Sequence, residues 1–224
     1  MARFRRRLRR RKPVRRVGRR ARPRRWQRRR KTGTLYCKLT KITIYSIDNT
    51  KNDFLDLAVN PEDFTEYTSL AKNFEFCKFL KVKVTILPLQ NVSNSSSSIM
   101  PCYAMTPWHY NIPIPNGFDK FLSMDKAKCF RGTQVGRQTY VPSVMVQTGQ
   151  MPNTVPNPLT APYLTTVHWR PEIRTVQSTG EKTPTIRTGA VCFQGSSEIV
   201  NKTSAYNIKW DVWVKFSGQT TMLL

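Results

Sequence analysis

The residues best suited to chemistry in this sequence are the arginines and lysines of its first 31 positions. Residues 1–31 hold 17 Arg and 2 Lys and no acidic residue, so they carry 19 of the 38 basic residues of the chain. An arginine fork can bind phosphate through two hydrogen bonds and stack on a base, whereas a lysine ammonium acts as a point charge. Two basic runs, Arg5–Lys12 and Arg28–Lys31, are typical of nuclear localisation signals, and Trp26 offers a stacking face.

This segment is therefore predicted to bind nucleic acid and to direct nuclear import. Both uses need the same charges, so the sequence does not separate them. The alternatives are a solubilising tail or nonspecific binding to any polyanion. The predicted residues are Arg3, Arg5, Arg6, Arg7, Arg9, Arg10, Arg11, Lys12, Arg15, Arg16, Arg19, Arg20, Arg22, Arg24, Arg25, Trp26, Arg28, Arg29, Arg30 and Lys31.

The other polar residues offer little catalytic chemistry. The two histidines, His109 and His168, have no HExxH motif, nucleophile elbow or carboxylate cluster beside them. The acidic group at residues 62–66 is better explained as charge at the start of a helix. The glycine-punctuated stretch Gly132–Arg137 is either a phosphate-binding loop or, more commonly, a simple turn. We predict no catalytic residue, no metal site and no cofactor.

The charge distribution divides the chain into two parts. Residues 32–224 hold 19 Lys and Arg against 13 Asp and Glu, a net charge of +6 out of the total of +25. A segment with the charge density of the first part cannot bury a core, so residues 1–33 are predicted to be a disordered arm. Residues 34–224 are long enough for a single folded domain.

The cysteines and the hydropathy restrict the class of protein further. The five cysteines are widely spaced and form no CxxC pair, which favours buried free thiols over disulfides or a cysteine-rich zinc site. No run of 18 apolar residues predicts a membrane span, and the arginine-dense start is unlike a secretory signal.

The folded part shows the alternating pattern of β-strands. Residues 34–47 alternate but shift parity, which predicts a β-bulge near Thr40 and Lys41. Residues 74–89 place Leu80, Val82, Val84 and Ile86 on one face, and residues 206–216 form a further core strand. One short helix is predicted over residues 61–72, capped by Asn60. About eight antiparallel strands with long proline-rich loops predict an all-β jelly-roll sandwich.

Several lysines fall on the polar faces of these strands. Lys81 and Lys83 alternate with the apolar residues of the 74–89 strand. They either line an inner surface that contacts DNA or, as is more common, form the solvated face of the strand. The same two alternatives hold for four further lysines: Lys38, Lys41, Lys209 and Lys215.

Between Pro107 and Lys120, apolar side chains lie in loop-like sequence. They either pack against neighbouring subunits or cover the ends of their own domain, and the sequence favours neither. The side chains are Trp108, Tyr110, Ile112, Ile114 and Phe118.

Three stretches together resemble the coat proteins of circoviruses and, more closely, of cycloviruses. They are the arginine-rich arm, the strand Phe74–Pro88 with its aromatic-Lys-Val-Lys-Val pattern, and the strand Tyr206–Phe216, which begins YNI and ends in phenylalanine. The resemblance covers about a quarter of the chain and leaves residues 95–200 unplaced.

The resemblance implies a jelly-roll subunit, a sixty-copy (T=1) icosahedral shell and a circular single-stranded DNA genome. It also implies nuclear delivery through the arm, and hence partners that are copies of this chain, the genome, host nuclear import receptors and an unidentified cell-surface receptor. Residues 91–98 and 148–162 would then be outer-surface loops. The alternative is a cellular chromatin-like or ribosomal protein with a basic tail.

Overall fold

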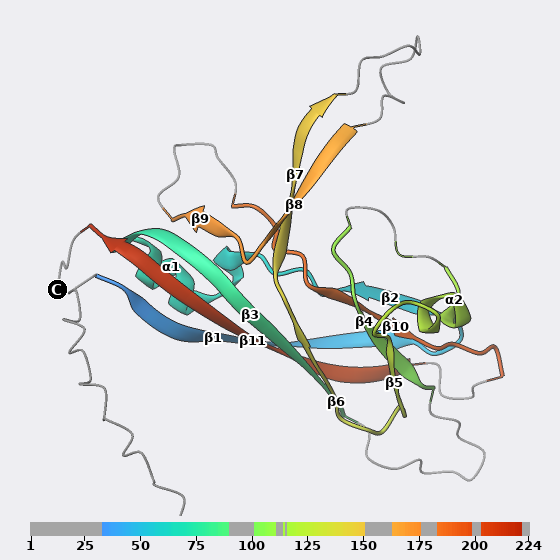
Figure 1. Ribbon diagram of the computed structural model, residues 1–224. Helices are drawn as coiled ribbons and strands as arrows, with labels where there is room; N and C mark the ends of the chain where they lie inside the picture. Colours follow the sequence, from blue (N-terminus) through green and yellow to red (C-terminus); the bar gives the residue numbers. More distant parts are fainter. Residues whose placement is uncertain are drawn as a thin grey trace, which may run out of the picture. The chain divides into compact units, whose positions relative to one another are not determined.

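The computed structural model describes residues 33–89, 101–110, 114, 116–150, 163–175, 183–198 and 203–220 of the 224-residue chain. Over these residues the chain is built mainly from antiparallel strands, most of them in two sheets that share a core (Figure 1). Residues 1–32 of the predicted arm, the loop at 91–98 and residues 151–162 lie outside the described residues.

The first sheet contains the long strands whose alternation is clearest in the sequence. Its strand order is β1-β11-β3-β6, and a short strand, β9, pairs with β3 beyond the end of β6. The bounds are β1 (Leu35–Asp48), β11 (Thr203–Gln219), β3 (Phe74–Pro88), β6 (Gly136–Tyr140) and β9 (Glu172–Arg174). The predicted strands at 34–47, 74–89 and 206–216 are thus confirmed.

The second sheet has the order β2-β10-β4-β5, also antiparallel. The bounds are β2 (Asp53–Asp56), β10 (Gly189–Phe193), β4 (Tyr103–Pro107) and β5 (Lys128–Phe130). Because β1 and β3 lie in the first sheet while β2 and β4 lie in the second, the chain crosses between sheets at successive connections. Two four-stranded paths connected in this way form a jelly roll, so the predicted fold class is confirmed.

A two-stranded sheet stands beside these layers. It pairs β7 (Ser143–Gln150) with β8 (Tyr163–Trp169) in antiparallel register (Figure 1). Because of β7, β8 and β9, the described residues contain more strands than the eight or so that the sequence predicted. Strand β7 also extends into the stretch 148–162, which was expected to be loop throughout.

Aromatic rings join the two sheets in the core. Tyr206 of β11 lies 4.9 Å from Phe193 of β10 and 5.8 Å from Tyr103 of β4, measured between ring centroids. All three side chains are at most 1% exposed. Such rings bury a large apolar area and favour tilted contacts, which fixes the packing of one sheet on the other.

The predicted bulge in the first strand is wrong. The register of β1 with β11 runs unbroken from Leu35 opposite Phe216 to Asp48 opposite Thr203. Ile42 and Ile44 instead point outward and are 58% and 69% exposed. The parity argument failed because it assumed that every apolar residue of the strand faces the core.

A bulge does occur in β3. The register with β11 shifts between Trp213 and Val214, opposite Leu80, which has no partner on β11. Leu80 is therefore only half-buried, whereas the flanking Phe79 and Val82 are fully buried. The prediction that Leu80 shares a face with Val82 is incorrect.

The single predicted helix at 61–72 is divided in two. A 3₁₀ turn, η1 (Pro61–Asp63), precedes α1 (Thr65–Ala71), and Phe64 between them is extended, with φ −104° and ψ 118°. Phe64 is 2% exposed, so the chain leaves the helix to bury this ring. Asn60 makes no cap; its Oδ1 accepts a hydrogen bond from Thr185 Oγ1 at 3.2 Å.

A second short helix was missed by the sequence reasoning. Helix α2 (Phe118–Leu122) buries Phe118 and Phe121, three residues apart, in a small cluster with Trp108. The i, i+3 spacing of these rings was the signal available in the sequence.

All five cysteines are free thiols, of which Cys77 and Cys192 are buried and Cys129 is exposed. The expectation of buried thiols therefore holds for some of them only. Over the described residues, no helix is long and apolar enough to cross a membrane.

Candidate nucleic-acid interface

The predicted site residues fall into two groups. Residues 3–31 lie outside the described residues, so their role stays a prediction. Lys81 and Lys83 lie on β3 and alternate with the buried Val82 and Val84, so both face away from the core. The structure thus places them on the outer face of the first sheet.

Other cations lie on the same outer face. The strand register places cations in adjacent rows across the sheet. In one row Lys38 of β1 pairs with Trp213 of β11, which pairs with Lys81 of β3. In the next row Lys215 of β11 pairs with Lys78 of β3. We call the eight cations on this side of β1, β11, β3, β6 and β9 the basic face; they are Lys38, Lys78, Lys81, Lys83, Arg137, Arg174, Lys209 and Lys215.

Three acidic residues share this side of the sheet in the described part of the chain. Asp48 lies at the far end of β1 and accepts hydrogen bonds from Thr50, and Glu172 lies 3.8 Å from Lys78. Asp211 lies in the middle, where its Oδ1 is 3.4 Å from Lys38 Nζ and 3.8 Å from Lys209 Nζ and accepts a hydrogen bond from Thr40. Asp211 therefore holds two lysines in place on the face.

Aromatic rings lie between these cations. Lys81 Nζ is 4.3 Å from the centroid of the Trp213 ring, within cation–π range. At the limit of that range, Lys215 Nζ is 6.0 Å from the Tyr36 ring and Arg174 Cζ is 6.0 Å from the Phe76 ring. Sequence reasoning did not single out these rings or Arg174, and it considered Arg137 only as part of the stretch Gly132–Arg137.

Lys41 behaves differently from the lysines with which it was grouped. It has the opposite parity on β1, and its Nζ lies 2.8 Å from Asp63 Oδ2 in η1. The lysines therefore divide: Lys38, Lys209 and Lys215 belong to the basic face, and Lys41 belongs to a surface ion pair.

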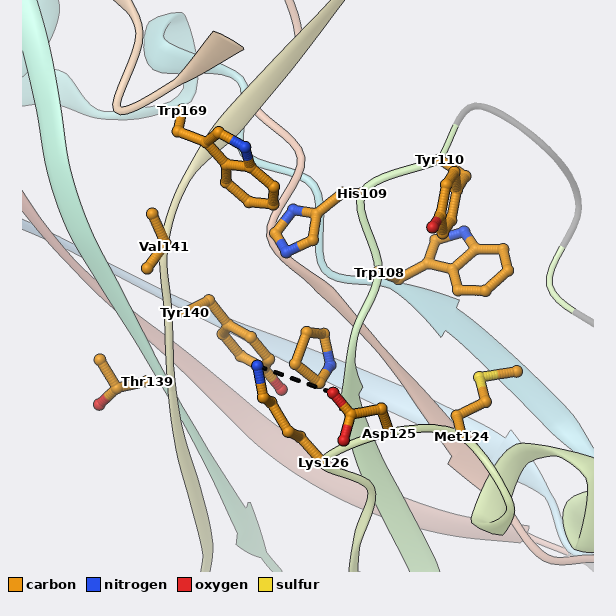
Figure 2. Close-up of a pocket in the computed structure, with 11 residues that line it drawn as sticks. Trp108, His109, Tyr110, Met124, Asp125, Lys126, Thr139, Tyr140, Val141 and Trp169 are labelled. Carbon is orange, nitrogen blue, oxygen red and sulfur yellow. Dashed lines mark ion pairs between the residues drawn. The ribbon is translucent and has the colours of Figure 1, made fainter. Parts of the chain in front are cut away.

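A cavity of about 620 Å³ lies elsewhere, beside β6 and the ends of β4 and β8 (Figure 2). The rings of Trp169 and His109 make an edge-to-face contact, with centroids 4.6 Å apart. The rings of Trp108 and Tyr110 make another, with centroids 5.2 Å apart. Lys126 and Asp125 form an ion pair at its rim. Over the described residues no group of His, Cys, Asp or Glu could hold a metal ion.

The cavity bears on the two alternatives for the aromatic loop. Trp108 and Phe118 are buried, and Ile114 packs against them, so these three cover their own domain. Tyr110 is 54% exposed and remains available to a neighbour, and Ile112 lies outside the described residues. Within the stretch Gly132–Arg137, residues 132–135 form the turn that leads from β5 into β6, with the backbone N–H of Gln134 donating to the carbonyl of Arg131, and Gly136 and Arg137 begin β6.

Acid is expected to destabilise the fold through His109. Burial lowers the pKa of His109 below its ordinary value of 6.5; the Lys126 charge lowers it further, and a hydrogen bond to the Arg187 backbone opposes both. As the pH is lowered through 6.5, the unfolded chain therefore takes up a proton at His109 at a higher pH than the folded chain does. The free energy of unfolding consequently decreases as the pH decreases.

Urea unfolding between about pH 7.5 and 5.5 measures this dependence. His109→Gln is expected to flatten it. An equal slope in wild type and His109→Gln would contradict the assignment.

Comparisons with known proteins agree with this architecture. A family model described as circovirus capsid protein matches residues 5–220. The capsid protein of Human associated cyclovirus 1 is 42% identical over 192 residues, which are 84% of each chain. The crystal structure of a 60-mer BFDV capsid protein covers 86% of this chain and 98% of its own, with a TM-score of 0.60 and 13% identity. The decameric form of the BFDV capsid protein gives a TM-score of 0.52 at 16% identity, covering 82% and 99%.

Proposed function

Because this chain belongs to the circovirus capsid protein family, we propose that it encloses a circular single-stranded DNA genome in a sixty-copy (T=1) icosahedral shell. Capsid proteins of this family are structural components of the virion, not enzymes. The jelly roll supplies the wall of such a shell, and the solved 60-mer with the same fold supports this copy number. The proposal rests mainly on the concentration of 19 basic residues in the first 31 positions of a capsid-fold protein.

The arm supplies the charge that DNA packaging requires. Sixty arms of 19 charges bring on the order of a thousand positive charges into one particle. Each phosphate that is neutralised releases condensed counterions, which drives the association. Arginine predominates over lysine by 17 to 2, which adds bidentate phosphate contacts and base stacking.

The same arm is proposed to carry the protein to the host nucleus. The runs Arg5–Lys12 and Arg28–Lys31 match the composition that import receptors bind. The partners are then further copies of this chain, single-stranded DNA, host import receptors and a host cell-surface receptor.

Size-exclusion chromatography of the full-length protein, with electron microscopy of the leading peak before and after nuclease, tests the proposal. Closed shells of uniform diameter that protect their DNA are expected. A small species that loses its nucleic acid to nuclease or high salt would instead indicate an open, chromatin-like binding protein.

A further inference from the structure

We infer that the basic face is a second binding surface for single-stranded DNA, separate from the arm, on which a base stacks against Trp213. The inference rests on the proposed function, since it adds a contact between the packaged strand and the wall of the shell. It assigns the ligand by chemistry: a flexible polyanion with accessible aromatic bases.

The distribution of charge is the first observation. The basic face contributes eight cations and three acidic residues to one side of one sheet, a net charge of 8 − 3 = +5. The whole of residues 32–224 carries only 19 − 13 = +6. Nearly all the excess positive charge outside the arm therefore lies on this face, whereas a merely solvated face would mix both signs as the rest of the chain does.

The position of the aromatic rings is the second observation. Trp213, Tyr36 and Phe76 make the cation–aromatic contacts of the described residues, and all three lie on this face. Trp213 is half-buried, which holds the indole in place while leaving part of it accessible. Aromatic side chains between cations form the usual platform for single strands, because each base offers a π-face and each phosphate a charge.

The spacing of the side chains fits a strand lying across the sheet. Lys38, Trp213 and Lys81 occupy one row across three strands, and Tyr36, Lys215 and Lys78 occupy the next. On β1 and β11 these rows are about 6.6–6.8 Å apart, since every second residue points the same way. On β3 the bulge at Leu80 places Lys81 and Lys78 three residues apart. A base on Trp213 would therefore have cations on both sides and in the next row.

A second copy of this chain does not suit the same surface. Two basic faces would repel each other, because each carries a net charge of 8 − 3 = +5 over the described residues. Duplex DNA also fits poorly, because its stacked bases cannot reach an indole that lies on a sheet. Single-stranded DNA satisfies both the charges and the rings.

Ultraviolet cross-linking of DNA-filled particles of the full-length protein tests the inference. The protein is digested with a protease that cleaves before aspartate, and nucleotide adducts are located by mass spectrometry. Adducts are expected in the arm and in the peptide Asp211–Leu224, which carries Trp213. Adducts in the arm alone would overturn the inference and leave the proposed function standing, whereas no adducts at all would count against both.

Matched variants give an independent readout in solution. Trp213→Leu is expected to weaken binding of an oligo-dT probe at high salt by about fivefold or more, the effect of one stacked base. Trp169→Leu is the control, because Trp169 is 55% exposed on β8, away from the basic face. Equal losses in the two variants, at equal thermal stability, would refute stacking on Trp213.

The lysines are tested by the salt dependence of the same binding. Lys81→Gln combined with Lys83→Gln is expected to lower the slope of log affinity against log salt by about 1.4, or about 0.7 for each phosphate contact. Lys120→Gln with Lys128→Gln, at exposed positions off this face, is expected to leave the slope unchanged. An unchanged slope in the first variant would show that these lysines are only solvated.

Discussion

Shells that contain almost no DNA are the expected product when all 19 basic residues of the arm are replaced by glutamine. The change removes the charge that is proposed to drive packaging through counterion release, on the order of a thousand charges for the proposed sixty copies. Nuclease-protected DNA per particle is expected to fall at least tenfold, measured by quantitative PCR and by the ratio of ultraviolet absorbances. The basic face remains in this variant, so residual protected DNA measures its share.

The matched control replaces the 17 arginines of the arm by lysine, which keeps the charge but removes the fork. Most of the DNA is expected to be retained, because counterion release depends on charge. A glutamine arm that still packages a full genome would contradict the role proposed for the arm. A lysine arm that packages none would show that bidentate contacts or stacking dominate over charge.

Phe216→Ala is expected to remove a large fraction of the stability of the folded domain. Phe216 is fully buried on β11, and its ring lies 5.4 Å from Phe74 and 6.0 Å from Tyr67, between ring centroids. Truncating such a ring leaves a cavity and costs about 3–5 kcal/mol. A domain has only about 5–15 kcal/mol in total, so the variant should unfold at much lower temperature and assemble poorly.

Differential scanning fluorimetry of the unassembled protein measures this effect. Phe216→Leu fills part of the cavity and is expected to lower the free energy of unfolding less than Phe216→Ala does. The difference separates the effect of lost packing volume from that of the lost aromatic ring. Tyr110→Ala, at a 54% exposed position, is expected to change stability by less than about 0.5 kcal/mol. A Phe216→Ala protein as stable as the Tyr110→Ala protein would contradict the assigned core.

The sequence alone predicted which side chains face the core wherever that depends on a single strand. The alternation in β11 predicted its buried residues. On β3, Lys81 and Lys83 were correctly placed on the face of the strand that points away from Val82 and Val84. These features are local, since the period of two fixes which side chains share a face.

Features that depend on neighbouring strands could not be predicted in this way. Ile42 is exposed because the register with β11 is continuous, and Leu80 leaves the core because β3 carries the bulge. Arg137 and Arg174 join Lys83 only through pairing with β3. A surface assembled from five strands needs their order and register, which no single stretch of sequence contains.

The pairing of β1 with β11 also has a consequence for synthesis. Among the described residues β1 pairs with β11 alone, which comes far later in the sequence, and β11 also separates β1 from β3. A chain released early would leave β1 and β3 as two long open edges, which invite aggregation. Contacts this distant in sequence form slowly. A competent subunit therefore requires that β11 has been synthesised, so chains that stop before β11 are expected to be excluded from assembly by the strand order.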